Sequence, residues 1–181
     1  QTAAIAVALG EALRPEFKSY SAQIVKNSKA LAKSLMENGI KLVTNGTDNH
    51  MILIDLTPFG KGNGIFAQEA LEEANITVNK NTIPAEPASP FYPSGIRLGT
   101  PAITTRGMKE GEMETIGKWI ADIIKEAKGF KLPDDKEERN DYLKEFKERI
   151  KKNENIKKIR NEVVELCKSF PLYPGFDVLG K

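Results

Sequence analysis

One arginine stands inside a short apolar segment of this sequence. The run Pro93-Ser94-Gly95-Ile96-Arg97-Leu98-Gly99-Thr100-Pro101 sets Arg97 between two glycines, with a proline closing each end. Such a segment predicts a strand with one buried face. A guanidinium is always charged, and its forked N–H groups suit bidentate contact with a carboxylate. Arg97 is therefore a candidate ligand for a carboxylate. The residues alone also allow an edge-strand arginine whose stem covers apolar surface while its head reaches water.

Prolines recur at every third position just before this segment, at Pro84, Pro87, Pro90 and Pro93. That spacing is typical of a polyproline II ligand for an SH3-like groove. It also suits a loop that its prolines stiffen, and we favour the loop because it lies between two expected strands. A non-catalytic interaction module stays open as an alternative function.

The remaining polar residues have structural interpretations. The single histidine, His50, follows an aspartate and an asparagine, but no nucleophile stands near it, so we interpret it as a structural residue of a turn. Asp55 at a strand end predicts a turn, and Thr104-Thr105 at an expected helix start predicts an N-cap. The sequence has neither the His and Cys spacing of a metal site nor a phosphate-binding glycine loop. We therefore predict no catalytic residue and no metal ligand in it.

Composition is that of an ordinary folded domain. The chain has 181 residues, of which 40% are hydrophobic and 29% charged, enough for one domain with a core. A formal charge of +2 gives no argument for nucleic acid or membrane as a partner. The single cysteine, Cys167, excludes an internal disulfide and is compatible with a reducing, cytoplasmic location. It falls among apolar residues at helical spacing, which indicates a core residue rather than a nucleophile.

The spacing of the apolar residues predicts helices alternating with short strands. We expect helices at residues 3–13, 21–38 and 65–74, after Thr104 as far as Gly129, and at 156–170. We expect strands at residues 40–44, 51–56 and 76–78 and around Arg97. The fold class that follows is α/β (α+β), with a short mixed or antiparallel sheet covered on one face by helices.

A densely charged segment lies near the end of the chain. Residues 131–160 contain 11 basic and 8 acidic side chains. Because the two signs are interspersed, the segment favours a solvated helix over a nucleic-acid site, where positive charge would dominate. Its thin apolar stripe consists of Tyr142, Leu143, Phe146 and Ile150. We expect residues 129–155 to form a charged helical insertion.

Three segments resemble one known family. The run Ser94-Gly95-Ile96-Arg97-Leu98-Gly99-Thr100-Pro101-Ala102-Ile103-Thr104-Thr105-Arg106-Gly107 is similar to the C-terminal signature of serine hydroxymethyltransferase, a pyridoxal-phosphate enzyme. The segment from Gly46 to Asp55 and the segment from Ala74 to Pro84 are similar to family motifs that come earlier in the same order. The likeness runs from the first helix to about Lys128 and resumes in the last helix; the charged segment departs from it.

The resemblance implies the small C-terminal domain of a fold-type-I pyridoxal-phosphate enzyme. Residues 1–38 would be a helix linking from a large domain outside this sequence, and residues 39–181 would form the small domain. The chain starts at Gln1 in mid-helix pattern, so we expect a piece of a longer protein. None of its lysines matches the family's Schiff-base motif. The large domain would therefore bind most of the cofactor, pyridoxal 5'-phosphate, and this fragment would be inactive alone.

Residue roles follow from the same resemblance. Arg97 would hold the carboxylate of serine or glycine, and Asn81 with the stretch Ser89-Pro90-Phe91 would lie at the folate site. The complete enzyme would be a homodimer or tetramer that interconverts serine plus tetrahydrofolate and glycine plus 5,10-methylenetetrahydrofolate. An aminotransferase or a threonine aldolase of the same fold type would also use an arginine clamp, but the folate-loop motif argues against both.

Overall fold

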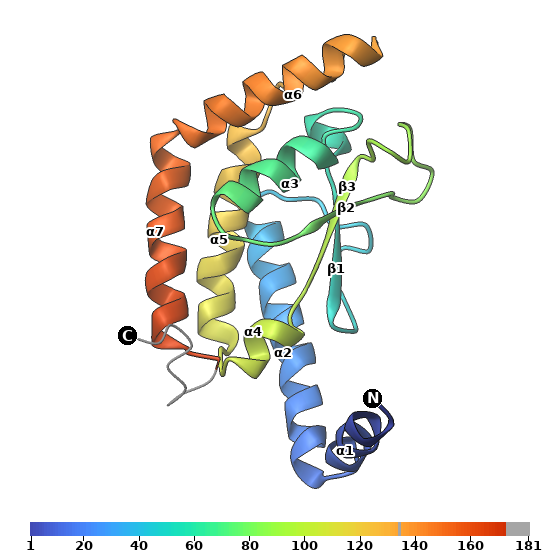
Figure 1. Cartoon of the computed structure of the whole chain (residues 1–181), viewed down its shortest axis with the longest axis vertical. Helices are drawn as coiled ribbons and strands as arrows, with labels where there is room; N and C mark the ends of the chain where they lie inside the picture. The colour runs from blue at the N-terminus through green and yellow to red at the C-terminus, as the bar shows by residue number, and fades with distance from the viewer. Residues whose placement is uncertain (134, 173–181) are drawn as a thin grey trace.

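A computed structural model of the chain describes residues 1–133 and 135–172, leaving aside the side chain of residue 136. Figure 1 shows the helices α7, α5 and α2 following one another from the outer edge of the molecule towards a small sheet. The elements in chain order are α1 (Thr2–Ala12), α2 (Pro15–Glu37), β1 (Met51–Asp55), the 3-10 turn η1 (Thr57–Phe59), α3 (Gly64–Glu73), β2 (Asn79–Asn81), β3 (Gly95–Gly99), α4 (Pro101–Thr105), α5 (Glu110–Glu126), α6 (Lys136–Lys151) and α7 (Glu154–Ser169).

The sheet is antiparallel throughout, with β3 in the middle of the order β1-β3-β2. Ile96 of β3 lies opposite Ile54 of β1, and all of its side chain is buried. Antiparallel sheets commonly bury one face and leave the other open, which matches β3 from Ile96 onwards, where Ile96 and Leu98 are covered and Arg97 and Gly99 are exposed. The predicted class, a small α/β domain with a short sheet packed by helices, is confirmed.

The pair α2 and α5 forms the helical layer next to the sheet. Leu31 and Leu35 on α2 and Ile120 on α5 are at most 1% exposed. The two helices approach closely because α5 has Gly117 at the contact; a Cβ there would collide with Ser34 of α2. Small residues at such a contact allow the side chains on either side to interdigitate at core density.

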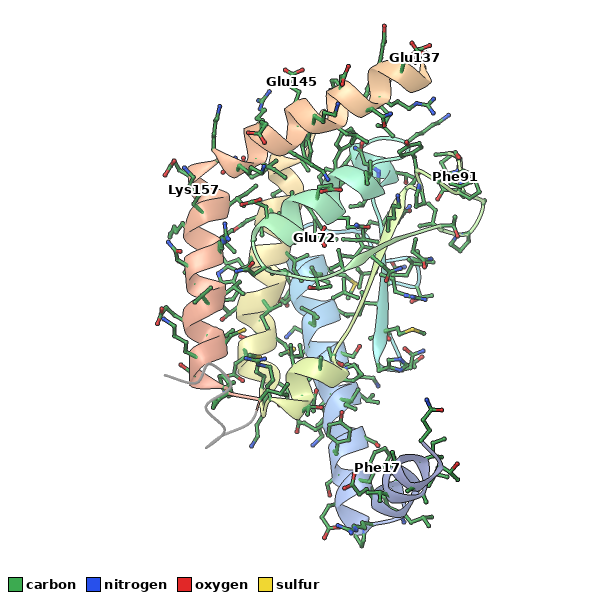
Figure 2. All side chains as sticks on the ribbon, in the orientation of Figure 1. Phe17, Glu72, Phe91, Glu137, Glu145 and Lys157 are labelled. Atoms are coloured by element: carbon green, nitrogen blue, oxygen red, sulfur yellow. The ribbon has the colours of Figure 1, made fainter. Side chains whose placement is uncertain are left out.

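Aromatic rings fix α6 to the rest of the domain. Phe146 of α6 is 1% exposed and lies with its ring centre 4.9 Å from that of Phe66 on α3 and 4.6 Å from that of Phe130. Tyr142 adds an edge contact to Phe66 at 6.1 Å. The predicted apolar stripe of the charged helix is thus confirmed as its docking face. Figure 2 shows Glu145 and Glu137 of α6 pointing away from the domain.

Two predicted strands are wrong. Residues 40–44 do not form a strand, because only Leu42 pairs there, in a single bridge to Ile54. The chain then turns at Asn45, whose φ of 51° lies in the left-handed region that asparagine tolerates.

The strand expected at residues 76–78 is displaced to β2, at residues 79–81. The amide of Ile76 instead donates to the carbonyl of Leu71 at 2.9 Å and so completes the end of α3. Pairing with β3 decides where the strand lies, and the polar residues of β2 pair in spite of their low strand propensity.

The N-cap expected at Thr104-Thr105 is also wrong. Both residues lie inside α4, and the next helix begins only at Glu110. Thr104 is buried, and its hydroxyl donates to the carbonyl of Thr100 at 2.8 Å while accepting from the side-chain Nδ2 of Asn27 at 2.8 Å. Thr104 therefore connects α4 to α2 by a hydrogen bond instead of capping a helix.

Cys167 is partly buried against the core, as expected. Across residues 1–133 and 135–172, no helix has the length and apolar character needed to cross a membrane, and no three His, Cys, Asp or Glu side chains gather as metal ligands do.

The ring cluster predicts a clear difference between two neighbouring positions on α6. Phe146→Ala should lower the free energy of unfolding by about 3–5 kcal/mol, because it removes a buried ring and leaves a cavity. The exposed neighbour provides the control: Glu145→Ala should change the same quantity by less than about 0.5 kcal/mol. Denaturant unfolding followed by circular dichroism measures both. Equal effects at the two positions would contradict the docking of α6 through this ring cluster.

Candidate functional site

The open face of the sheet carries Arg97. Because side chains alternate along a strand, Ile96 and Leu98 face the helices while Arg97 points to the opposite side. Its neighbours across the strands are Leu53 on β1 and Asn79 on β2. The side chain is exposed, so β3 holds an arginine beside the core without burying its charge.

Glycines border Arg97 along its own strand, at positions 95 and 99. A Cβ at Gly95 would lie 2.6 Å from the side chain of Ile83 and 2.8 Å from the carbonyl oxygen of Ile54, so no other residue fits without a shift. Gly95 is therefore needed for the close approach of the neighbouring strands, whereas Gly99 is exposed and adds no side chain next to Arg97.

The Arg97 guanidinium has one hydrogen bond within the described residues, from Nε to Oδ1 of Asn79 at 3.4 Å, and no ion pair there. It borders an open depression of about 650 Å³, which the loop of residues 43–49 forms with Met51 and Leu53. The acidic residue of that loop, Asp48, lies 3.8 Å from Lys29. The outer N–H groups of Arg97 are therefore available to an anion, and a carboxylate is the partner that a guanidinium fork fits best.

Asn81 shares the open face with Arg97. It lies two residues after Asn79 on β2 and opposite Gly95, where the carbonyl oxygen of Asn81 and the side chain of Ile83 occupy the space that a Cβ would need. Its Nδ2 donates to the carbonyl of Thr82 at 2.7 Å, and its Oδ1 has no donor within the described residues. The structure thus brings Arg97 and Asn81, predicted from separate motifs, onto one surface.

Ser89, Pro90 and Phe91 lie on the loop between β2 and β3 and are exposed. Phe91 is 80% exposed, and Figure 2 shows it on this loop, on the side of the molecule opposite α7. The hydroxyl of Ser89 accepts a hydrogen bond from the amide of Phe91 at 3.3 Å, which shapes the turn. An aromatic side chain so exposed offers its faces to a planar ligand.

Glu86 organises this loop. Its carboxylate accepts hydrogen bonds from the amides of Ile83, Ala88 and Ser94 at 3.0–3.2 Å and from the Ser94 hydroxyl at 2.6 Å. The fully buried Ser94 also accepts from the amide of Gly62 at 3.0 Å. Partial burial alone would raise the pKa of Glu86, but these hydrogen bonds outweigh it and lower that pKa below its ordinary value.

The four prolines do not form a polyproline II helix. Ala85 has a φ of 54°, far from the value of about −75° that such a helix requires. A further turn follows, where the amide of Tyr92 donates to the carbonyl of Ser89 at 2.9 Å. Pro93 is buried at the entrance to β3. This geometry does not favour the alternative of a module that presents a proline ligand.

The other two polar candidates have structural surroundings. His50 is exposed, and its carbonyl oxygen accepts a hydrogen bond from the amide of Thr100 at 3.1 Å. Asp55 accepts from the amide and hydroxyl of Thr57 at 2.9 and 2.6 Å, which forms the predicted turn, and pairs with Lys41 at 2.7 Å. Burial would raise the pKa of Asp55, but the bonds from Lys41 and Thr57 lower it.

Sequence reasoning did not identify Asn79, Glu86 or the loop of residues 43–49 as parts of this site. The sequence nevertheless contains two patterns that point to Asn79 and Glu86. Asn79 and Asn81 alternate, as residues on one face of a strand do. Glu86 is the one charged residue from Thr82 to Pro93, where prolines and small residues leave few other acceptors for the backbone amides.

Comparison with known proteins identifies the family. The family model described as serine hydroxymethyltransferase matches residues 1–120, which include Asn81, Glu86, Phe91 and Arg97. The chain belongs to the serine hydroxymethyltransferase family. The resemblance inferred from the three motifs is confirmed, and the other fold-type-I enzymes are not favoured.

Individual relatives extend the match beyond the family model. A serine hydroxymethyltransferase of Methanospirillum hungatei is 48% identical over 172 residues, covering 95% of this chain and 36% of the relative. Those of Phenylobacterium zucineum and Rippkaea orientalis are each 46% identical, covering 94% and 96% of this chain and 35% of each relative. The chain therefore spans about a third of the length of the curated relatives it matches.

The hydrogen bonds of Glu86 predict how stability depends on pH. Glu86→Gln should lower the free energy of unfolding at pH 7 by about 1–2 kcal/mol, because an amide cannot accept all the bonds that the carboxylate accepts. Since folding lowers the pKa of Glu86, the carboxylate stabilises the fold fully above the pKa of an unfolded glutamate, about 4.3. That stabilisation disappears as the pH falls through the lower pKa of the folded chain.

Urea unfolding of the parent and the variant between pH 3 and pH 7 measures this difference. The two stabilities should converge towards the acid end. Glu72→Gln is the matched control, because Glu72 is exposed at the end of α3 and the same charge is removed there. A gap between parent and Glu86→Gln that stays constant over the whole range would exclude the stabilising role of the carboxylate.

Proposed function

We propose that this chain is the C-terminal part of a serine hydroxymethyltransferase, which interconverts serine plus tetrahydrofolate and glycine plus 5,10-methylenetetrahydrofolate. One observation carries the proposal: the Arg97 guanidinium lies exposed on the open sheet face beside Asn81, with no carboxylate partner among the described residues. Arg97 binds the carboxylate of serine or glycine. Asn81, Ser89, Pro90 and Phe91 bind the folate cosubstrate.

The role of Arg97 follows from what the cofactor requires. Pyridoxal 5'-phosphate, when bound, withdraws electrons from a substrate bond that stands perpendicular to its ring. Two parallel hydrogen bonds from Arg97 to the substrate carboxylate fix the rotation of the amino acid and so set that angle. The anchor of Arg97 is a strand in the middle of the sheet, which keeps the guanidinium in place during the reaction.

The described residues suit binding of the substrate carboxylate, but they do not suit covalent attachment of the cofactor. A lysine that bonds covalently to pyridoxal phosphate needs a pocket that lowers its pKa. Where burial is described, every lysine of this chain is exposed except Lys80, which is half-buried and lies 5.6 Å from the ring centre of Tyr92. We place the attachment lysine and the phosphate site in the two-thirds of the family sequence outside this chain. The chain alone is then inactive.

The exposed helix α1 indicates where this part of the enzyme meets the rest of the protein. Every residue of α1 is exposed, including Ile5, Val7 and Leu9 at 60–62%. Figure 1 places α1 apart from the main body, and Phe17 lies beside it in Figure 2. Residues 1–38 therefore lead from the large domain into the small domain of residues 39–181, with α2 packed into its core and residues 129–155 as a charged helical insertion. The complete enzyme is a homodimer or tetramer, and its single cysteine in this part is compatible with the cytoplasm.

Substitution of Arg97 in the full-length protein tests the proposed clamp. Arg97→Ala should weaken serine binding by about 10- to 150-fold, because a charge-assisted bond contributes about 1.5–3 kcal/mol. Arg97→Lys should recover part of this loss, since lysine retains the charge but not the fork. Calorimetry with serine, together with the cofactor's absorbance, measures both properties. Cofactor binding should persist, and a serine affinity close to the parent's in Arg97→Ala would disprove the clamp.

Substitution of Phe91 tests the folate assignment separately. Phe91→Ala should raise the KM for tetrahydrofolate by about 2- to 10-fold, the effect of losing one aromatic contact, without changing the KM for serine. Asn81→Ala should act on the same parameter through a lost hydrogen bond. Phe17→Ala is the control, because Phe17 is a partly exposed phenylalanine at the other end of the domain. A rise in the KM for serine alone would argue against a folate contact at this loop.

A further inference from the structure

Asn79 accepts a hydrogen bond from the Arg97 guanidinium. The two residues are direct partners across β2 and β3 and lie on the same open face of the sheet. The Oδ1 atom of Asn79 accepts from Nε of Arg97 at 3.4 Å, and its Nδ2 donates to the carbonyl of Lys80 at 3.3 Å. The second bond orients the amide with its oxygen towards the arginine.

This contact limits how a carboxylate can approach. A guanidinium offers two bidentate edges, one formed by Nε with an Nη atom and the other by the two Nη atoms. Because Asn79 occupies Nε, the edge formed by the two Nη atoms remains for the ligand. Arg97 is exposed and borders the open depression that it forms with the loop of residues 43–49, so this edge stays accessible.

The chemistry of an amide suits this position. An aspartate in place of Asn79 would form an ion pair with Arg97 and compete with the carboxylate of the substrate. Asparagine instead holds the guanidinium with a neutral oxygen and leaves its full positive charge for the ligand. An arginine on an exposed surface otherwise loses considerable side-chain entropy when a ligand orders it, and the bond from Asn79 reduces that loss.

We propose that Asn79 is a positioning residue that directs the Nη1–Nη2 edge of Arg97 towards the substrate carboxylate. The proposal rests on the proposed function, in which Arg97 binds that carboxylate. It adds a determinant of affinity for amino-acid substrates over their uncharged amides, and it lies outside the folate contacts.

The experiment uses the full-length enzyme and measures the dissociation constants of serine and of serinamide, which has the same side chain but no carboxylate. Asn79→Asp should weaken serine binding by more than about tenfold, as expected where a like charge lies beside an ion pair, and should leave serinamide binding unchanged. Asn79→Ala should weaken serine binding about threefold, because the guanidinium loses one anchor. The KM for tetrahydrofolate should not change in either variant.

Asn161→Asp is the matched control, since it makes the same charge change at an exposed position on α7. Serine binding like the parent's in Asn79→Asp, or equal weakening of serine and serinamide, overturns the role of Asn79. Arg97→Ala is measured in parallel to separate the two hypotheses. If Arg97→Ala binds serine normally, the proposed function itself fails; if it loses serine while Asn79→Asp retains it, only the positioning role fails.

Discussion

The position of β3 between β1 and β2 is the constraint on which the rest of this structure depends. Its backbone groups pair with strands on both sides. At Gly95, the carbonyl oxygens of Ile54 and Asn81 approach more closely than any side chain would permit. The alternation of the strand then puts Ile96 into the core and Arg97 onto the open face. One backbone arrangement therefore stabilises the domain and presents its charged group.

The strands place no acidic side chain directly opposite Arg97 on the open face of the sheet. Glycines border Arg97 on its own strand, and asparagines supply neutral polar groups on β2. Two acidic residues of the flanking loops have partners of their own: Glu86 binds amides of its own loop, and Asp48 lies 3.8 Å from Lys29. A guanidinium in such surroundings keeps its charge for a ligand.

Sequence reasoning predicted the helices more reliably than the strands. Apolar spacing predicts the helices well, because α2, α5 and α7 each bury one continuous face. It does not predict β2, because three polar residues form a strand only through pairing with β3, a contact distant in sequence. For the same reason Asn79 could not be assigned: its role depends on the register between two strands. Arg97 and Asn81 were proposed as site residues from motifs. Glu86 was not identified, because the amides and the hydroxyl that it binds come together only in the folded loop.

A structure of the full-length enzyme with bound glycine is the most direct test of the central claim that Arg97 binds the substrate carboxylate. The account predicts the two carboxylate oxygens at about 2.7–2.9 Å from Nη1 and Nη2 of Arg97, the range for charge-assisted bonds. Nε should remain on Asn79. A glycine carboxylate bound by other residues, with Arg97 left in solvent, would contradict the account.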